Sequence, residues 1–296
     1  MSMISVRGAC DMHIHSAPDI FTRLADDVHV AEICMNAGMR AIMLKCHADT
    51  TMARAWHTER SVQGIKVMGG IVLNLNVGGI NPSAVDAALK MGAQQVWMPT
   101  YHSLAHFKET GKMGGYAYQG SDVSQDYVVK PISILDNRDE LIEEIEPILK
   151  LIKKYNVILG TGHLSSHEAL KLIGAARDFG LEKVVITHPF FSPPNCSITD
   201  IKKAVDMGAF VEFCGGNALS PLPKQIEFKL YKETIEAVGT EQCIISSDAG
   251  HPRKTMPHEI IRMFGQSLAV SGVPAKNIEA MMIYNYDKLF ELPPVN

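Results

Sequence analysis

The sequence is poor in aromatic residues, in paired cysteines and in positive charge. Only 7% of its 296 residues are aromatic, so a folded core has to be built mainly from aliphatic side chains and the 16 methionines. The six cysteines are scattered and form no CxxC pair, which argues against a disulfide framework and predicts reduced thiols. With 28 basic against 32 acidic residues, the net charge of -4 provides no field that would steer the chain onto a phosphate backbone.

Targeting and membrane-spanning segments are also missing. No run approaches the ~18 consecutive apolar residues of a membrane-spanning helix. The opening residues, MSMISVRGACDMHIHS, carry an arginine and an aspartate where a signal peptide needs an apolar stretch. We therefore expect a cytoplasmic protein that binds neither membranes nor nucleic acids. No GxGxxG follows the first apolar run, so the fingerprint of a dinucleotide-binding domain is absent as well.

What the sequence does contain is one repeated pattern, a short apolar run that ends in polar residues. Eight such runs predict eight strands, which leaves 37 residues for each strand-and-helix unit. The predicted strands are Ala9–His15, Arg40–His47, Ile65–Leu73, Gln94–Thr100, Asn156–His163, Lys183–His188, Ala209–Cys214 and Cys243–Asp248.

The segments between these runs have helical periodicity and recognisable caps. Asn81 precedes a proline at the start of one helix, and Ser165 with Glu168 and Ser197 with Asp200 have the spacing of capping boxes. Strands that alternate with helices predict a parallel sheet, and strands that are apolar throughout are covered on both faces. Eight units favour a closed (βα)8 TIM barrel over an open sheet, and we expect one domain over residues 1–296.

One connection is much longer than the ~2–6 residues usual between a strand and a helix. Tyr101–Lys130 follows the fourth predicted strand and shows neither helical nor strand periodicity. It falls at the end of the barrel where the loops after the strands build the site. We predict a lid-like insertion over residues 101–130 that contacts a small-molecule substrate, with His102, His106 and Tyr116 as the expected contacts.

The polar residues at the strand ends converge on one site. His13 and His15 are two positions apart on a strand, so their side chains project to the same side, and Lys45 and His47 repeat this geometry. Burying imidazoles and charged groups without partners is costly, and bound cations explain the whole set. Imidazole and carboxylate ligands favour Zn²⁺, with Mn²⁺, Fe²⁺ or Ni²⁺ as alternatives, as one or two ions. The predicted metal ligands are His13, His15, Lys45, His163, His188 and Asp248.

Several further residues have two possible structural roles. Asn74, at the end of the third predicted strand, is a candidate to bind substrate or to hold a loop, and His251 is a candidate for substrate or for the surface. Glu212 lies in an apolar strand and faces either the site or the helices. Cys214 ends the same strand, where we expect a small core residue.

The ordered set of His13-Ile14-His15, His163, His188 and Asp248 resembles the amidohydrolase superfamily of metal-dependent barrels. Asp11 completes the frequent D-x-H-x-H form, and the segment Asn285–Phe290 is similar to a common N-x-x-x-L-F ending. The resemblance spans Asp11 to Leu292 and is greatest to an uncharacterised bacterial and archaeal branch with no assigned reaction. It implies a barrel enzyme whose metal makes water nucleophilic at neutral pH.

The resemblance also implies roles. Asp248 would move the proton from water to the leaving group, and His47 would polarise the substrate or hold its anionic part. One departure concerns the fourth strand, where many members place a carboxylated lysine or a glutamate between two metals. Here Val96–Thr100 offers no such ligand. Lys45 either supplies the bridge after carboxylation by CO₂ or stays an ammonium that binds substrate.

The resulting prediction is a hydrolase for an amide, cyclic amide, lactone or other ester bond of a small molecule. One alternative is a phosphoesterase of the polymerase-and-histidinol-phosphatase type, although the segment Asp248–His251 has one residue too many for the expected Asp-x-His. Decarboxylation or isomerisation on the same barrel is a further alternative. A non-catalytic barrel that binds metal or ligand is the alternative from another class. Barrels of this size often self-associate, so we also allow for a homo-oligomer.

Overall fold

Eight parallel strands lie in one sheet in the order of the sequence, in a computed structural model that describes residues 3–116, 130–219 and 226–292. Each strand falls within one of the eight predicted runs. The strands are β1 (Cys10–Ile14), β2 (Ala41–Leu44), β3 (Lys66–Val72), β4 (Gln95–Trp97), β5 (Ile158–Gly160), β6 (Val184–Ile186), β7 (Phe210–Cys214) and β8 (Cys243–Ser246).

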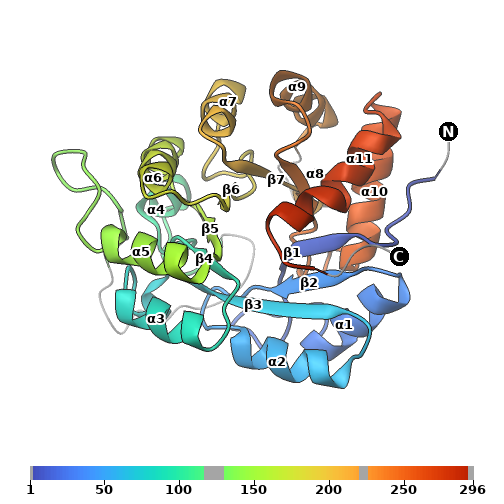
Figure 1. The fold of residues 1–296 in the computed structure, drawn as a ribbon, viewed down its shortest axis with the longest axis horizontal. Coiled ribbons are helices and arrows are strands. Elements are labelled where there is room, and N and C mark those ends of the chain that lie inside the picture. The colour runs from blue at the N-terminus through green and yellow to red at the C-terminus, as the bar shows by residue number, and fades with distance from the viewer. Residues whose placement is uncertain (1–2, 117–129, 220–225, 293–296) are drawn as a thin grey trace.

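The sheet closes on itself where β1 meets β8. Ile14 forms a parallel bridge with Ala249, and the backbone N–H of His15 donates to the carbonyl of Ala249 at 2.9 Å. The helices lie on the outside of the strands (Figure 1). The predicted TIM barrel is therefore confirmed, and the closure places the end of β1 directly beside the segment that follows β8.

The helices begin largely where the sequence predicts. The side chain of Asn81 accepts from two backbone N–H groups, and Ser165 and Glu168 form a complete capping box. The second predicted box is only half formed, because Asp200 bonds the hydroxyl of Ser197 instead of its backbone N–H. The helices are α1 (Asp27–Asn36), α2 (Met52–Ser61), α3 (Pro82–Lys90), α4 (Leu104–Thr110), α5 (Ile145–Tyr155), α6 (Ser166–Asp178), α7 (Ile198–Asp206), α8 (Gly215–Ala218), α9 (Phe228–Val238), α10 (Pro257–Val270) and α11 (Ala275–Met282), with 3₁₀ turns η1 (Leu75–Val77) and η2 (Tyr284–Lys288).

The interior of the barrel holds an apolar cluster, separate from the core between strands and helices. Met12, Met43 and Trp97 belong to this cluster, together with Tyr286 and Phe290 from the C-terminal segment. The rings of Tyr286 and Phe290 stack with their centroids 6.0 Å apart. The segment that resembles the N-x-x-x-L-F ending therefore closes the lower end of the barrel, where the strands begin.

The segment Tyr101–Lys130 corrects one expectation. It contains the helix α4, whose first turn is capped by Ser103 and which ends at Gly111 with a φ of 67°. Seven residues make only two turns, too few to give a periodic pattern, so the sequence predicted irregular structure there. Residues 117–129 of the predicted lid lie outside the described residues. Among the described helices, none combines the length and the apolar character that crossing a membrane requires.

Candidate metal centre

The ends of β1, β2, β5, β6 and β8 bring the predicted ligands together. The Nε2 atom of His13 lies 3.0 Å from Nζ of Lys45 and 3.3 Å from Oδ1 of Asp248. Nε2 of His15 lies 3.5 Å from the same Asp248 oxygen. The ring centroid of His188 is 5.6 Å from that of His13 and 4.9 Å from that of His163.

These side chains surround one cavity of about 50 Å³. A water molecule needs roughly 10–15 Å³ measured in this way, so the cavity has room for cations and a few waters. His47 lines it too, with its ring stacked on that of His15 at 4.6 Å. Lys45 does not line the cavity and reaches the cluster through His13. The structure thus gathers all six predicted ligands, from residues up to 235 positions apart in sequence (Asp248 and His13).

Two of the ligand positions have unusual backbone. His188 has a φ of 29° and Asp248 a φ of 50°, in the left-handed region that side chains other than glycine seldom adopt. Both residues follow closely on the ends of strands. Such conformations persist where the surrounding structure enforces them, and they concentrate at functional sites. Gly250 serves the same region, since a Cβ there would lie 2.0 Å from the carbonyl oxygen of His15.

Burial sets the protonation of the cluster. It lowers the pKa of His15, His47 and His163 well below the ordinary value and that of His188 to about 3. These imidazoles are therefore neutral at pH 7 and can offer a lone pair. Burial raises the pKa of Asp248, but Lys254, His13 and His15 outweigh it and hold that pKa well below its usual range.

Several of these buried atoms have no hydrogen-bond partner. The Nδ1 atoms of His15, His163 and His188 are buried and unpartnered in the described structure. Leaving a buried polar atom unpaired costs about 1–3 kcal/mol, so three in one cluster need a common explanation. A divalent cation held by imidazole nitrogens and the Asp248 carboxylate supplies it, and this donor set suits Zn²⁺ and its neighbours. The residues fit a metal centre.

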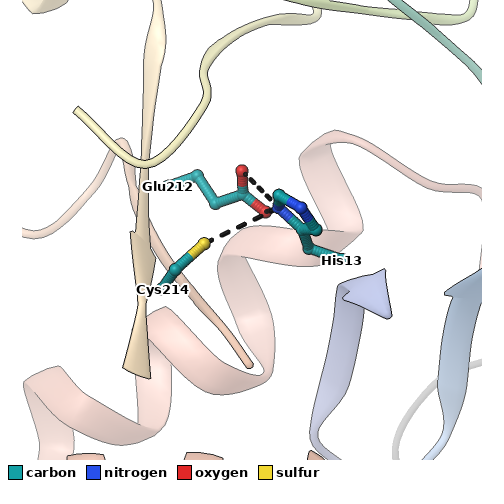
Figure 2. A group of neighbouring side chains, drawn as sticks. All are labelled: His13, Glu212 and Cys214. Carbon is teal, nitrogen blue, oxygen red and sulfur yellow. Dashed lines mark hydrogen bonds and ion pairs between the residues drawn. The ribbon is translucent and has the colours of Figure 1, made fainter. Parts of the chain in front are cut away.

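The ring of His13 is oriented by two residues of β7, Glu212 and Cys214 (Figure 2). Its Nδ1 lies 3.2 and 3.3 Å from the two oxygens of Glu212 and 3.7 Å from Sγ of Cys214. A proton on Nδ1, donated to Glu212, leaves the lone pair on Nε2, which faces Lys45 and Asp248. This is the usual way in which a carboxylate orients a metal-ligating histidine. Of the two readings of Glu212, the structure selects the one that faces the site, and Cys214 faces it too.

Lys45 is completely buried beside His13. Burial lowers its pKa, while the negative charges of Glu212 and Asp248 raise it, and burial prevails. Its Nζ also lies 5.4 Å from the ring centroid of Trp97, on the strand where the sequence has no bridging ligand. Lys45 thus lies between β1 and the ligand-free strand β4.

The predicted substrate contacts divide into two groups. Tyr116 and His251 line the cavity, and the hydroxyl of Tyr116 lies 3.2 Å from Nε2 of His47. Asn74, His102 and His106 do not line it. They hold loops in place instead.

Each of these three residues has at least one polar atom hydrogen-bonded within the protein, although Nδ1 of His106 is buried without a partner in the described structure. Asn74 donates to the carbonyl of His47 at 2.9 Å and accepts from the N–H of Thr100 at 2.8 Å. His102 accepts at Nδ1 from the N–H of Leu75, and Nε2 of His106 lies 3.0 Å from the carbonyl of Gly115. A sequence marks such residues as polar, but it does not show which partners are already within reach.

Besides Ala249, which directly follows Asp248, four residues line the cavity that sequence reasoning did not find. They are Arg23, Phe191, Asn217 and Lys254. None stands at the end of an apolar run, and all belong to segments that follow a strand. The available signal was their position in the loops after β1, β6, β7 and β8, which in a barrel surround the site.

Comparisons with known proteins agree with this architecture. A family model described as "Family of unknown function (DUF6282)" matches residues 8–212, and no curated protein matches the chain. A lactonase from Listeria monocytogenes has a similar structure, with a TM-score of 0.60 and 14% identity over 99% of this chain and 100% of that one.

Two other solved structures are similar to the same degree. An amidohydrolase from Pseudomonas aeruginosa gives a TM-score of 0.60 at 13% identity, covering 95% of each chain. The organophosphorus hydrolase from Deinococcus radiodurans gives 0.59 at 10% identity, over 98% of this chain and 97% of that one. These likenesses confirm that the chain has the barrel fold that the amidohydrolase resemblance implied.

Proposed function

We propose that this chain, which belongs to the DUF6282 family of unknown function, is a metal-dependent hydrolase of small molecules. The observation that carries the proposal is the cluster of His13, His15 and Asp248, whose ligand atoms all lie within 4.8 Å of one another on a cavity that His163 and His188 also line. His13, His15, His163, His188 and Asp248 would hold the metal, with Lys45 as a sixth ligand. Zn²⁺ is the favoured ion, and Mn²⁺, Fe²⁺ and Ni²⁺ are the alternatives.

A divalent cation held by these residues would lower the pKa of a bound water to near neutrality and would polarise a carbonyl oxygen. The protein supplies the remaining chemistry. Asp248 is ionised at neutral pH, because Lys254 and the neighbouring histidines favour its charged form, so it can take a proton from water. The same carboxylate can then pass that proton to the leaving group.

We propose that His47 holds the substrate carbonyl. Its Nδ1 lies 2.8 Å from the hydroxyl of Thr100, which fixes the ring, and its Nε2 is turned toward Tyr116 and the cavity. Tyr116 belongs to the predicted lid over residues 101–130, of which the structure describes 101–116 and 130. We propose that this segment excludes water from the reaction, so its deletion should abolish turnover and leave metal binding intact.

The bond cleaved is proposed to be an amide, cyclic amide, lactone or other ester. Structures similar to this chain include an amidohydrolase and a lactonase, which supports this range of carbonyl substrates. All six cysteines are free and buried, which is compatible with the proposed cytoplasmic location.

Metal content and turnover test the proposal together. The purified protein should contain one or two divalent ions per chain and hydrolyse at least one member of a panel of lactones, esters and cyclic amides. Chelation should stop turnover, and Zn²⁺ should restore it. Turnover of phosphoesters alone would favour a phosphoesterase, and metal without any turnover would favour a binding protein.

The variant His13→Ala/His15→Ala is the matching control for the metal. It should lose bound metal and the thermal stabilisation that metal gives, because a ligand that binds only the folded state stabilises that state. Unchanged metal content in this variant would show that the ligands have been assigned wrongly.

A further inference from the structure

One side of the cavity is lined by donors that the metal centre does not use. Arg23 lies in the loop after β1, Asn217 in α8 after β7, and Lys254 in the loop after β8. Since β7, β8 and β1 are neighbours around the barrel, the three side chains come from one sector of its mouth. His251 lines the same cavity from the loop of Lys254.

The loops that carry the two cations are tied to each other. The N–H of Leu24, next to Arg23, donates to the carbonyl of Gly250 at 2.9 Å. Nζ of Lys254 donates to the carbonyl of Asp248 at 3.1 Å, and a Cβ at Gly216 would lie only 2.9 Å from that Nζ. The side chains of Arg23 and Lys254 are 5% and 9% exposed, so both are packed into the wall of the cavity.

Part of this donor capacity is unused. Arg23 directs Nε and Nη2 to a single oxygen, Oδ2 of Asp19, at 2.9 and 2.7 Å, and its Nη1 donates to no residue that the structure describes. The Nδ2 group of Asn217 is buried and likewise lacks a partner among the described residues. Leaving a buried donor such as Nδ2 of Asn217 without an acceptor is costly, so an acceptor from outside the chain is expected beside it, within reach of the free Nη1 of Arg23.

The charges lining the cavity indicate what that acceptor is. Among the described residues that line it, Asp248 is the one carboxylate, and the metal centre and Lys254 already engage it. Of the histidines that line it, His13, His15, His163 and His188 are assigned to the metal centre. What remains is two cations and a neutral donor, which together attract a negative group.

We propose that Arg23, Lys254 and Asn217 form a subsite for an oxyanion, so that the substrate carries a carboxylate or phosphate close to the bond that is cleaved. This inference rests on the proposed hydrolase function and narrows its substrate class to anionic molecules. Guanidinium and ammonium groups together recognise both carboxylate and phosphate through charge-assisted hydrogen bonds. A neutral ester would leave the same donors unpaired.

Two esters that differ in one charge test the proposal on the metal-loaded protein. They are 4-nitrophenyl acetate and 4-nitrophenyl hydrogen succinate, which share a leaving group. We expect kcat/KM to be about tenfold higher for the succinate ester, the equivalent of one charge-assisted hydrogen bond. Arg23→Gln and Lys254→Gln should each remove most of this preference, chiefly by raising KM for the succinate ester.

The ratio of kcat/KM for the two esters is the decisive quantity, because Lys254 also contacts Asp248 and its loss can slow both reactions. Arg253→Gln is the matched control. It removes the same charge from the same loop at an exposed position that does not line the cavity, so it should keep the preference. The proposal is overturned if Arg23→Gln and Lys254→Gln change both esters equally, or if Arg253→Gln has the same effect.

Binding gives a second readout that does not depend on turnover. In calorimetric titrations, monomethyl succinate and inorganic phosphate represent the two kinds of oxyanion, and dimethyl succinate is the neutral control. At least one anion should bind the normal protein about tenfold more tightly than it binds either variant, and the neutral diester should not distinguish them. The stronger anion identifies the source of the charge.

The two proposals can therefore fail separately. If the normal protein cleaves neither ester but binds an anion through Arg23 and Lys254, the subsite stands and ester hydrolysis falls. If it cleaves both esters without preference and binds no anion more tightly than the variants do, hydrolysis stands and the subsite falls. Because Arg23→Gln leaves Asp19 buried without its cation, Asp19→Asn/Arg23→Gln serves as the test where the single variant does not fold.

Discussion

The two ends of the barrel solve the problem of buried polar groups in opposite ways. At the lower end, Asn285 donates to the carbonyls of Thr240 and Cys243, both at 2.7 Å, and the hydroxyl of Tyr286 lies 2.7 Å from the carbonyl of Ile245. At the mouth, three imidazole nitrogens lack partners, and His188 and Asp248 have left-handed backbone. The C-terminal segment at the lower end thus pairs its own polar groups within the protein, although Gln95 at the start of β4 is buried with both side-chain polar atoms unpartnered, whereas the unpartnered histidine nitrogens at the mouth gather around one cavity.

This contrast separates stability from function. In TIM barrels the loops at the carboxyl ends of the strands carry the site, and the opposite end contributes mainly to stability. Here the C-terminal segment provides the apolar closure below, and segments from five strands provide the ligands above. Substitutions at the two ends should therefore affect different measurements.

The largest effect on stability is expected at the lower end. Phe290 is 4% exposed and stacks on Tyr286, so Phe290→Ala should lower the free energy of unfolding by about 3–5 kcal/mol. Metal affinity should stay the same, because the ligands lie at the other end of the barrel. Urea unfolding of the metal-free protein and a zinc titration measure the two effects.

A smaller cost at the lower end is expected for Tyr286→Phe, which removes only the hydroxyl. Loss of that group leaves the Ile245 carbonyl without its donor, at about 1–3 kcal/mol. A drop in metal affinity in either variant would mean that the two ends are coupled, contrary to the comparison.

At the mouth, Glu212→Gln tests how much the carboxylate partner of His13 contributes to metal affinity. The substitution keeps the size of the side chain but removes the charge that holds the proton on Nδ1 of His13. Removing such a partner typically weakens metal binding by about 10–100-fold, and we expect a value in this range. Competition with a chelator of known affinity measures it.

Glu168→Gln is the matched control for a buried glutamate. Glu168 accepts the backbone N–H of Ser165 in the capping box of α6 and the hydroxyl of Ser133, and none of its hydrogen bonds among the described residues is to a predicted ligand. Its loss should lower stability and leave zinc affinity unchanged. Equal losses of affinity in both variants would argue against a specific role for Glu212.

The barrel, and the convergence of the proposed ligands at its mouth, could be predicted from sequence because both follow periodic rules. A strand that is apolar throughout and ends in His or Asp places that residue at the carboxyl edge of the sheet, and all eight strands share that edge. This is why His163 and Asp248 were found although their neighbours in space are distant in sequence. Most of the information about the site came from the change from apolar to polar residues at the end of each predicted strand.

The rest depends on loop geometry, which has no period. Arg23 reaches the cavity because its loop bonds to Gly250, a contact between residues 226 positions apart (Leu24 and Gly250). His102 and His106 have the right residue type in the right segment, but Leu75 and Gly115 each engage one of their ring nitrogens. Sequence shows that a residue can bind, and only the folded loops show whether it is already bound.

The substitutions with the smallest expected effect are those of Lys45. It is a buried cationic residue at the mouth whose pKa is lowered by burial, and its Nζ donates to Nε2 of His13 at 3.0 Å. A neutral amine reacts with CO₂ to give a carbamate and releases a proton, and the anion offers two oxygen ligands. Because Lys45 does not line the cavity, a ligand role is favoured over direct contact with substrate.

We therefore expect Lys45→Ala to lose one of two metals, so that metal content per chain falls by half, and formate or acetate should restore part of it. Lys45→Met is the control, because its side chain fills the space and leaves no room for a small carboxylate, so formate should have no effect. The measurement is the metal content of both variants with and without formate. Formate is added at about 5 mM to ~0.1 mM protein, a concentration well below the ionic strength that screens surface charges. If Lys45→Ala keeps all its metal and instead raises KM for the succinate ester, Lys45 is an ammonium that binds substrate and the carbamate is wrong.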